Sequence, residues 1–255
     1  MRSLVVIPTY NERQNLPELV DAVLACDRSL DVLIVDDNSP DGTGAIADDL
    51  SRQSDGRLRV VHRPAKQGLG TAYVSGFRDA LDRGYERVVE MDADFSHRPD
   101  DLPALLQAAS AADVVIGSRN VPGGRAVGWS WLRTLISKGG SVYARWLLGL
   151  PVHDCTSGFK CLGRRALEVL DLDALRSNGY AFQVEVNYAC SRAGLHFREV
   201  PIIFPDRARG KSKMSWRIVV EAFWLVIRLR LGLTQAPLTP TPSTRPAAFD
   251  RGTAT

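Results

Sequence analysis

Short apolar runs alternate with longer amphipathic stretches along the first half of the chain. The apolar runs are rich in Val and Ile and lie at Leu4–Ile7, Val32–Val35, Leu58–Val61, Arg87–Met91 and Val114–Ile116. Helical periodicity marks the stretches between them, at about 15–25, 42–53, 70–83 and 99–111. Runs of this kind are typical of strands buried on both faces, and their alternation with helices indicates βαβ units. The pattern therefore predicts an α/β fold, with a Rossmann-like, mostly parallel sheet flanked by helices.

The second half of the chain is less regular. A loop that contains Gly and Trp occupies 121–131. Helices are expected after it, at about 132–148, 164–170 and 182–193. The run Phe197–Phe204 predicts a strand that is interrupted at Pro201, because proline has no N–H group to donate to a ladder.

We expect one domain over residues 1–233. Its first part, 1–118, is the nucleotide-binding half, and 119–216 is the acceptor half. Residues 234–255 are rich in Pro, Thr and Ala and have almost no large apolar side chains, which predicts a disordered tail.

A largely apolar segment lies between these parts, at 217–233. In a helix, Arg217, Glu221 and Arg228 would fall within one narrow polar stripe. The segment is too short and too charged to span a bilayer. It either lies on a membrane surface as an interfacial amphipathic helix or packs against the sheet or an oligomer partner, and we expect the first.

Composition adds limits on partners and compartment. The chain has 32 basic and 29 acidic residues and a net charge of +3, which argues against a nucleic-acid partner. Its four cysteines show no CxxC pairing, so we expect free or buried thiols in a reducing compartment. The first strand begins too early to leave room for a signal peptide, which predicts a cytoplasmic protein.

Polar residues follow the first two predicted strands. Pro8-Thr9-Tyr10-Asn11-Glu12 follows the first strand, and Asp36–Gly42 follows the second. The carboxyl ends of parallel strands face one crevice, where Tyr10 could stack on a base and Glu12 and Asp37 could accept hydrogen bonds. The alternative for Asp36–Gly42 is a turn with a helix cap. Neither GxGxxG nor a Walker sequence is present, which disfavours dehydrogenases and P-loop proteins.

The fourth predicted strand runs into Met91-Asp92-Ala93-Asp94. Carboxylates two residues apart at a strand end can converge on one hard cation, Mg²⁺ or Mn²⁺, whose shell diphosphate oxygens would complete. The alternative is a solvated loop that caps the next helix. The position of the triplet, in the same crevice as Asp37, favours the metal.

These motifs together resemble the GT-A glycosyltransferases of family 2. The motifs that carry the resemblance are, in order, Ile7–Glu12, Val35–Thr43, Gly68–Gly70, Met91–Asp94 and Gly117–Arg119. A narrower likeness, to dolichol- or polyprenyl-phosphate mannosyltransferases, rests on Trp129–Arg133 with Ile136-Ser137, on Asp154–Phe159 and on Arg207–Lys213. The resemblance covers about residues 4–215 and implies a GT-A fold.

The resemblance also implies roles for individual residues. It would place the guanosine of a GDP-mannose donor on Pro8, Tyr10, Glu12, Val35 and Asp37. Asp92, Ala93 and Asp94 would lie by the ribose and diphosphate, with Asp94 the primary metal ligand. Asp92 would be a second metal ligand and Ser96, where some relatives have Gln, a third.

By the same resemblance, four cationic side chains would bind the phosphates. Arg119 and Arg133 would meet the acceptor phosphate, and Arg207 and Lys213 would clamp phosphates from a mobile loop. A lipid monophosphate has a second pKa of about 6, so it is largely a dianion at neutral pH and needs no strong general base. Positive charge that aligns two anions is what the reaction requires.

We therefore expect an inverting transferase that moves mannose from GDP-mannose to a polyprenyl monophosphate. Two alternatives remain: the same fold using UDP-glucose or another sugar nucleotide, and a catalytically silent nucleotide-binding subunit. We expect a peripheral position on the cytoplasmic face of a membrane, and a membrane-embedded partner protein is a further expectation, since some relatives carry membrane helices that this sequence lacks.

The remaining histidines and tryptophans have simpler interpretations. His97 follows the acidic triplet but lacks partners at a metal-binding spacing, so we expect a satisfied core or surface residue. Trp129, Trp131, Trp146 and Trp224 could contact lipid, and of these Trp146 is expected in the core instead.

Overall fold

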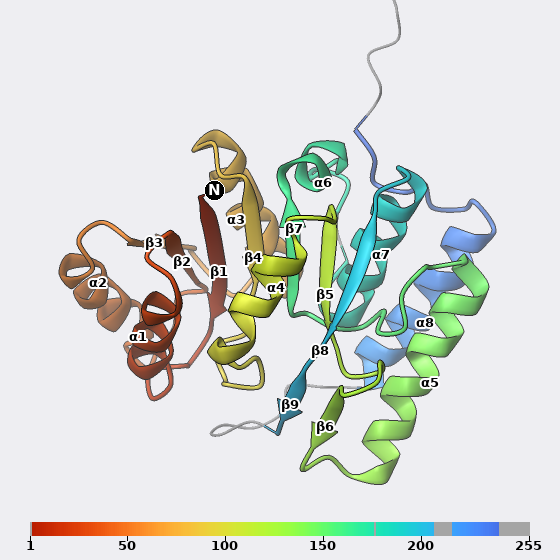
Figure 1. Cartoon of the computed structure of the whole chain (residues 1–255), viewed down its shortest axis with the longest axis horizontal. Helices are drawn as coiled ribbons and strands as arrows, with labels where there is room; N and C mark the ends of the chain where they lie inside the picture. The colour runs from red at the N-terminus through yellow and green to blue at the C-terminus, as the bar shows by residue number, and fades with distance from the viewer. Residues whose placement is uncertain (1, 176, 207–215, 240–255) are drawn as a thin grey trace, which may run out of the picture.

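The computed structural model describes residues 2–175, 177–206 and 216–239. Its centre is a seven-stranded sheet with the order β3-β2-β1-β4-β7-β5-β8 (Figure 1). The strands of this sheet are β1 (Ser3–Thr9), β2 (Leu30–Asp36), β3 (Leu58–His62), β4 (Arg87–Glu90), β5 (Val114–Ser118), β7 (Lys160–Gly163) and β8 (Phe197–Pro201). The expected mostly parallel sheet is confirmed.

Strand β7 is the exception to the parallel order. It pairs antiparallel with β4 on one side and with β5 on the other, while the remaining pairs of this sheet are parallel. Lys160, at the start of β7, is therefore the register partner of Glu90, at the end of β4. An antiparallel strand begins where its parallel neighbours end, so the start of β7 adds a side chain to the carboxyl edge of the sheet.

Helices cover both faces of the sheet. On one face lie α1 (Leu16–Cys26), α2 (Thr43–Gln53) and α4 (Leu102–Ala108), the last preceded by a short 3-10 turn, η1 (Pro99–Asp101). On the other lie α3 (Leu69–Asp82), α6 (Arg164–Val169) and α7 (Gly179–Arg192). Alternate strand residues feed the two cores: Val5 and Ile7 pack on one side, and Leu4 and Val6 on the other. The continuous apolar runs in the sequence follow from this double burial.

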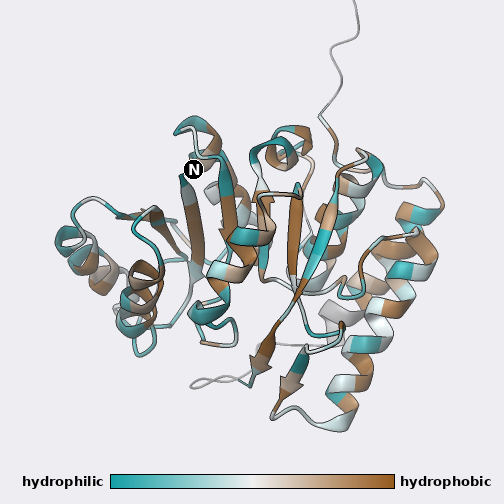
Figure 2. Cartoon of the chain, in the orientation of Figure 1, coloured by the Kyte–Doolittle hydropathy of each residue, from teal (hydrophilic) through white to brown (hydrophobic). Residues whose placement is uncertain are grey.

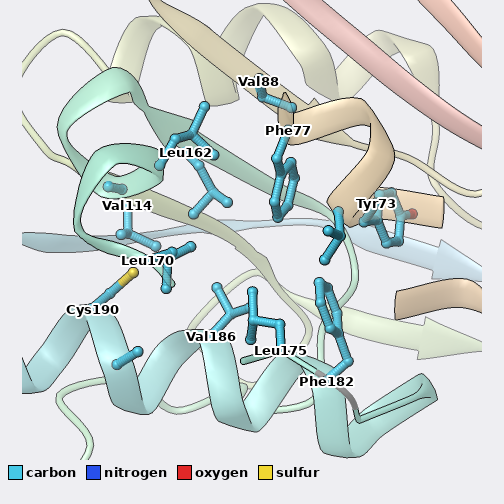
Figure 3. Packing of buried hydrophobic residues seen from close by; sticks show 14 of the residues in the cluster. Tyr73, Phe77, Val88, Val114, Leu162, Leu170, Leu175, Phe182, Val186 and Cys190 are labelled. Carbon is cyan, nitrogen blue, oxygen red and sulfur yellow. The ribbon is translucent and has the colours of Figure 1, made fainter. Parts of the chain in front are cut away.

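Aromatic rings join α3 to α7 in the second of these cores. Tyr73 and Phe77 from α3 stack with Phe182 from α7, with centroids 6.0–6.4 Å apart (Figure 3). The central strands are mostly brown, the colour of hydrophobic residues, in Figure 2, whereas β8 also carries hydrophilic residues. The described cysteines are free, as predicted, and Cys155, Cys161 and Cys190 are buried.

Helices α5 (Trp131–Leu148) and α8 (Trp216–Arg230) form one end of the molecule (Figure 1). Near them β6 (Arg125–Val127) and β9 (Ile203–Pro205) make a small parallel sheet. Helix α8 contacts α5 and α7, and its Val226 and Leu229 are buried there. The helix expected at 217–233 thus packs on α5 and α7 along one side, and a membrane contact for its other side stays a prediction. Its Trp224 and Phe223 remain exposed.

The halves 1–118 and 119–216 share one sheet, because β7 and β8 complete the sheet begun by β1–β5. Two expectations need correction. Trp146 is not in the core but 82% exposed, on the side of α5 that faces away from the protein. The predicted tail does not begin at 234, since Leu238 bridges to Leu170 and Thr239 N donates to the carbonyl of Val169 at 2.9 Å.

Candidate active site

A cavity of about 390 Å³ opens at the carboxyl edge of the sheet. Its lining comes from the ends of β1, β2, β4 and β5, from the segment before β7 and from the start of α7. Among the predicted site residues that line it are Pro8, Tyr10, Glu12, Asp37, Asp92, Ala93, Asp94, Ser96, Arg119 and Arg133. The crevice expected from the strand order is therefore real.

Left-handed backbone shapes the cavity rim. Asn11, Asn38 and Phe95 each have positive φ, of 61°, 54° and 62°. Each lies just after a strand end, in a conformation that is costly for a residue with a side chain. Phe95 separates Asp94 from Ser96, whose N–H donates to Asp94 Oδ1 at 3.0 Å. This turn keeps the Asp94 carboxylate on the cavity side of the loop.

The segment Asp36–Gly42 contains both a turn and a site residue. Asp36 accepts hydrogen bonds from the hydroxyls of Thr9 at 2.8 Å and Ser39 at 2.6 Å. Asp41 accepts from the Thr43 N–H and hydroxyl at the start of α2. The turn-and-cap interpretation is correct for these residues, and Asp37 alone of the segment lines the cavity.

Asp37 is held rigidly. Arg63, itself buried, forms an ion pair with its Oδ1, and the N–H of Gln67 donates to its Oδ2 at 3.3 Å. The same guanidinium donates to the hydroxyl of Thr71 at 2.7 Å and to the carbonyl of Gly68 at 3.0 Å. Asp37 thus connects the loop before α3 to the end of β2. This structural role is additional to any contact that it makes with a ligand.

Tyr10 and Glu12 lie at the end of β1. The ammonium of Lys66, another lining residue, sits 4.1 Å from the centroid of the Tyr10 ring. Glu12 Oε2 accepts from Asn15 Nδ2 at 3.0 Å. Val35, in contrast, is fully buried in the core and does not line the cavity. Only its backbone could therefore contact a bound nucleotide.

The motif Gly68-Leu69-Gly70 permits a close approach of two segments. A Cβ on Gly68 would lie 2.2 Å from Asn178 Oδ1, and one on Gly70 would lie 2.3 Å from the Ser177 carbonyl. Side chains at these positions would force the start of α3 away from 177–179, which lines the cavity.

The acidic strand end is fixed by buried neighbours. Tyr73 Oη donates to Asp92 Oδ1 at 3.3 Å, and burial together with Asp92 raises the pKa of this tyrosine. The Asp92 N–H donates to His97 Nδ1 at 2.9 Å. Burial lowers the pKa of His97, whose ring stacks on Phe159 at 4.9 Å. His97 is a satisfied core residue, as expected.

The oxygen-only donor set of Asp92, Asp94 and Ser96 suits a hard cation. Within the described part of the chain, no group of three or more His, Cys, Asp or Glu side chains is placed to hold a metal. The fit is therefore to an ion that takes its remaining ligands from substrate and water.

Arg119 is the most firmly placed cation of the site. Its Nε and Nη2 donate to the Asp154 carboxylate at 2.8 and 2.7 Å, and its backbone N–H does so at 2.9 Å. Burial disfavours the charged form of both residues, but their mutual attraction and hydrogen bonds outweigh this effect. As a result, the pKa of Arg119 is raised and the pKa of Asp154 is lowered. Arg119 Nη2 also reaches Thr156 Oγ1 at 2.9 Å.

Arg133 lies farther out, on the first turn of α5. Its Nη1 donates to Asp206 at 2.8 Å, and its guanidinium carbon lies 4.0 Å from the Trp129 centroid. Its Nε is buried and has no hydrogen-bond partner among the described residues.

An apolar groove of about 340 Å³ adjoins the cavity. It shares four lining residues with the cavity: Trp129, Arg133, Thr156 and Tyr180. The groove continues between α5, α7 and α8, where its lining includes Gly140, Tyr143, Val184, Phe223 and Val226. A cavity lined by many charged side chains and an apolar groove thus meet beside Arg133.

Some expected residues cannot be placed, and others were missed. Arg207 and Lys213 lie outside the described residues. The sequence analysis overlooked several lining residues, namely Lys66, Asn178, Gly179, Tyr180, Gln183 and Phe204. Gln183 and Phe204 fall within the helix and the strand expected at 182–193 and 197–204, but those patterns do not show which side chains face the cavity. The other four lie in the loop before α3 and at the start of α7, which only the tertiary fold brings to the sheet edge.

A doubly wound sheet with an acidic strand end, buried arginines and a cavity at its carboxyl edge defines an α/β enzyme for phosphorylated substrates. Residues 4–171 match the family described as Glycosyl transferase family 2. The chain belongs to this family and is a glycosyltransferase.

The names of two similar proteins describe the transfer of mannose to a lipid carrier. The chain is 48% identical over 226 residues to the polyprenol monophosphomannose synthase of Mycolicibacterium smegmatis, covering 88% of this chain and 85% of that protein. It is 48% identical over 244 residues to the undecaprenyl-phosphate mannosyltransferase of Micrococcus luteus, covering 91% and 100%.

A solved structure supports the fold. Glucosyl-3-phosphoglycerate synthase from Mycobacterium tuberculosis, in complex with Mn²⁺, UDP-glucose and phosphoglyceric acid, superposes with a TM-score of 0.67. The match covers 91% of this chain and 80% of that one at 19% identity. The GT-A fold expected from the sequence is thereby confirmed.

Proposed function

We propose that the protein transfers mannose from GDP-mannose to a polyprenyl monophosphate, with inversion at the anomeric carbon. The relatives named above support the sugar and the acceptor class. The single observation that carries the proposal is that the cavity, with its charged lining residues, meets the apolar groove beside Arg133. A lipid phosphate has a charged head and an apolar chain, and this junction offers a place for each.

The donor would occupy the part of the cavity between β1, β2 and β4. Tyr10 offers a ring face on which the base could stack. Lys66 lies over one face of this ring, so either Lys66 moves away or the base binds to the opposite face. Glu12 and Asp37 supply acceptors near the base and ribose. The diphosphate would then lie by Asp92 and Asp94.

Asp92 and Asp94, with Ser96 beside them, would hold Mg²⁺ or Mn²⁺ between protein and diphosphate. The Mn²⁺ in the complex of the Mycobacterium tuberculosis enzyme supports a divalent ion. Such an ion supplies charge neutralisation at the leaving diphosphate.

The acceptor phosphate would lie between Arg119 and Arg133. Arg119 is partly neutralised by Asp154, so it supplies fixed N–H donors rather than a full free charge. Arg133 has a buried Nε without a partner in the described part of the chain, and a phosphate oxygen would satisfy it. The first lipid units would enter the groove between α5 and α8.

The reaction needs alignment more than proton transfer. An acceptor phosphate oxygen attacks the anomeric carbon, and the bond from that carbon to the diphosphate breaks with its electrons leaving on GDP. The dianionic acceptor carries no proton that a base must remove. Direct attack inverts the α-linked donor to a β-linked product, and the arginines hold the two anions in line.

Exposed apolar side chains support a membrane surface as the working site. Trp131, Leu135, Val142 and Trp146 on α5 are all exposed. At about 100° per residue they share a stripe roughly 60° wide. No helix in the described segments combines the length and apolarity needed to cross a membrane. We propose peripheral binding to the cytoplasmic face, with α5 and α8 toward the lipid; a membrane-embedded partner protein would bind beside them.

Transfer from radiolabelled GDP-mannose into organic-extractable lipid tests the function. Labelled UDP-glucose and other sugar nucleotides serve as competing donors, and each reaction is run with and without EDTA. We expect label from GDP-mannose alone, and only without the chelator. Transfer from UDP-glucose would favour the alternative donor, and no transfer from any donor would favour the silent subunit.

A further inference from the structure

A buried lysine lies beneath the floor of the cavity. The Lys160 side chain is fully buried at the start of β7. Its ammonium donates to Gln183 Oε1 at 2.6 Å, to Asn187 Oδ1 at 2.8 Å and, more weakly, to the Gln183 carbonyl at 3.4 Å. A buried ammonium is costly unless its donors are satisfied, and here α7 supplies all three acceptors.

A buried carboxylate faces the same glutamine from the other side. Glu90 is the last residue of β4, and its Oε2 accepts from Gln183 Nε2 at 2.7 Å. Burial raises the pKa of Glu90 to about 7, while the charge of Lys160 lowers it. The two residues are register partners in the sheet, so the backbone fixes their separation.

Lys160 and Glu90 together fix the orientation of the Gln183 side-chain amide. Its oxygen faces the ammonium of Lys160, and its nitrogen faces the carboxylate of Glu90. The flipped amide would place NH₂ against NH₃⁺ and oxygen against carboxylate. An amide nitrogen carries two hydrogens, and Glu90 takes one of them. Gln183 therefore presents a fixed donor rather than an interchangeable donor and acceptor.

The cavity has access to this donor. Gln183 is 2% exposed yet lines the cavity, together with Gly158. A Cβ on Gly158 would lie 3.5 Å from Gln183 Nε2 and 3.7 Å from His97 Cε1. The missing side chain at position 158 keeps the space above the amide open.

The chemistry of this floor favours a neutral oxygen. The Glu90 side chain lies directly beside the amide, with its Oε2 2.7 Å from Gln183 Nε2, and the cations suited to phosphate, Arg119 and Arg133, lie toward the groove. A sugar hydroxyl accepts from an amide without electrostatic conflict, whereas a phosphate oxygen would be repelled by Glu90.

We propose that Gln183 donates its second amide hydrogen to a hydroxyl of the transferred sugar and so contributes to the choice of sugar. Lys160 and Glu90 are positioning residues that hold the amide in its donating orientation. This inference rests on the proposed function, because it assigns a sugar to the cavity floor.

Donors that lack one sugar hydroxyl at a time test the contact. For the wild-type enzyme, kcat/KM for one GDP-deoxymannose should be roughly tenfold or more below that for GDP-mannose. In Gln183→Met this ratio should approach one, while affinity for GDP, which has no sugar, stays within about twofold. Lys160→Met and Glu90→Gln should reduce the discrimination in part.

Two further variants separate the contact from folding. Gly158→Ala removes no buried group, and its added methyl covers the amide, so it should also abolish the discrimination without lowering Tm. Asn187→Ala is the matched control: it removes one acceptor of Lys160 and lowers Tm, but it should leave the discrimination intact.

The outcomes are distinct. Unchanged discrimination in both Gln183→Met and Gly158→Ala overturns the inference while leaving mannosyl transfer in place. Equal loss in Asn187→Ala overturns it as well, because the network would then be structural only. A wild type that transfers no mannose overturns the proposed function, and the inference with it.

Discussion

Asp94 is the single residue on which the proposed chemistry depends most. Asp94→Ala should lower mannosyl transfer at least about 100-fold, because the site loses its main ligand for the divalent ion. The carboxylate lines the cavity and accepts from the Ser96 N–H at 3.0 Å, so the free energy of unfolding should fall by only about 1 kcal/mol when that hydrogen bond is lost. Turnover and chemical unfolding measure the two effects.

Asp100→Ala is the matched control for this variant. Its carboxylate is exposed, lies in η1 outside the cavity lining and forms an ion pair with Arg98, so transfer should be unchanged. Wild-type turnover in excess chelator would remove the metal from the proposal.

Asp154 offers a test by pH. Because its folded-state pKa is lowered, the Arg119–Asp154 pair stabilises the fold above the unfolded-state pKa, about 3.9, and this contribution is lost as pH falls through the folded-state pKa. At pH 7 Asp154→Asn should be about 3 kcal/mol less stable than wild type, since it leaves a buried guanidinium unpaired. Urea unfolding should show this difference shrinking below about pH 4. A difference that is independent of pH would assign the loss to packing rather than charge.

At the scale of elements, the groove beside α5 can be closed by one side chain. Gly140 lines it, and a Cβ there would meet no atom within 4 Å. Gly140→Leu should raise KM for a long-chain polyprenyl phosphate about tenfold and leave KM for GDP-mannose unchanged. Gly140→Ala should have little effect on transfer and should stabilise α5 by up to about 1 kcal/mol.

Steady-state kinetics with each substrate varied in turn measures this effect. Val142→Leu, on the exposed side of α5, controls for added bulk. A rise in KM for GDP-mannose instead would show that the groove does not serve the acceptor.

The elements that the sequence predicted are those with a clear period. The five parallel strands of the first half and α1 to α3 follow from apolar runs and helical stripes, and their ends place Tyr10, Asp37 and Asp94 at one edge. Strand β7 gave no such signal, because Lys160-Cys161-Leu162-Gly163 is short and begins with a charged residue. Whether this segment forms a strand depends on its contacts with Glu90 and α7, and only the folded chain brings these near it.

The same limit applies to the site and to surface helices. Asp36 and Asp37 are adjacent and chemically alike, yet one forms a turn and the other lines the cavity. Trp146 lies on an amphipathic helix whose buried side is decided by α8, a partner about eighty residues farther along the chain. Local pattern carries no information on such distant choices.

At the scale of the whole molecule, one end should attach to lipid. Replacing Trp131, Leu135 and Trp146 together with Ser should weaken binding to anionic vesicles at least about tenfold, since each loses apolar area available for burial. Vesicle flotation measures binding, and transfer to a short, water-soluble acceptor phosphate should be retained. Equal flotation of variant and wild type would place the membrane contact elsewhere.

The position of β7 also bears on how the chain folds during synthesis. Strand β5 has only β7 and β8 as neighbours in the sheet, and both follow it in the chain. A nascent chain that has emerged as far as Ser118 therefore exposes the apolar strand Val114–Ser118 on both edges. The edge that pairs with β7 stays open for about forty-five more residues and the edge that pairs with β8 for about eighty, and during this time β5 can pair with other chains. Slow translation just after Pro201, rather than after the nucleotide-binding half, would give the finished sheet time to close.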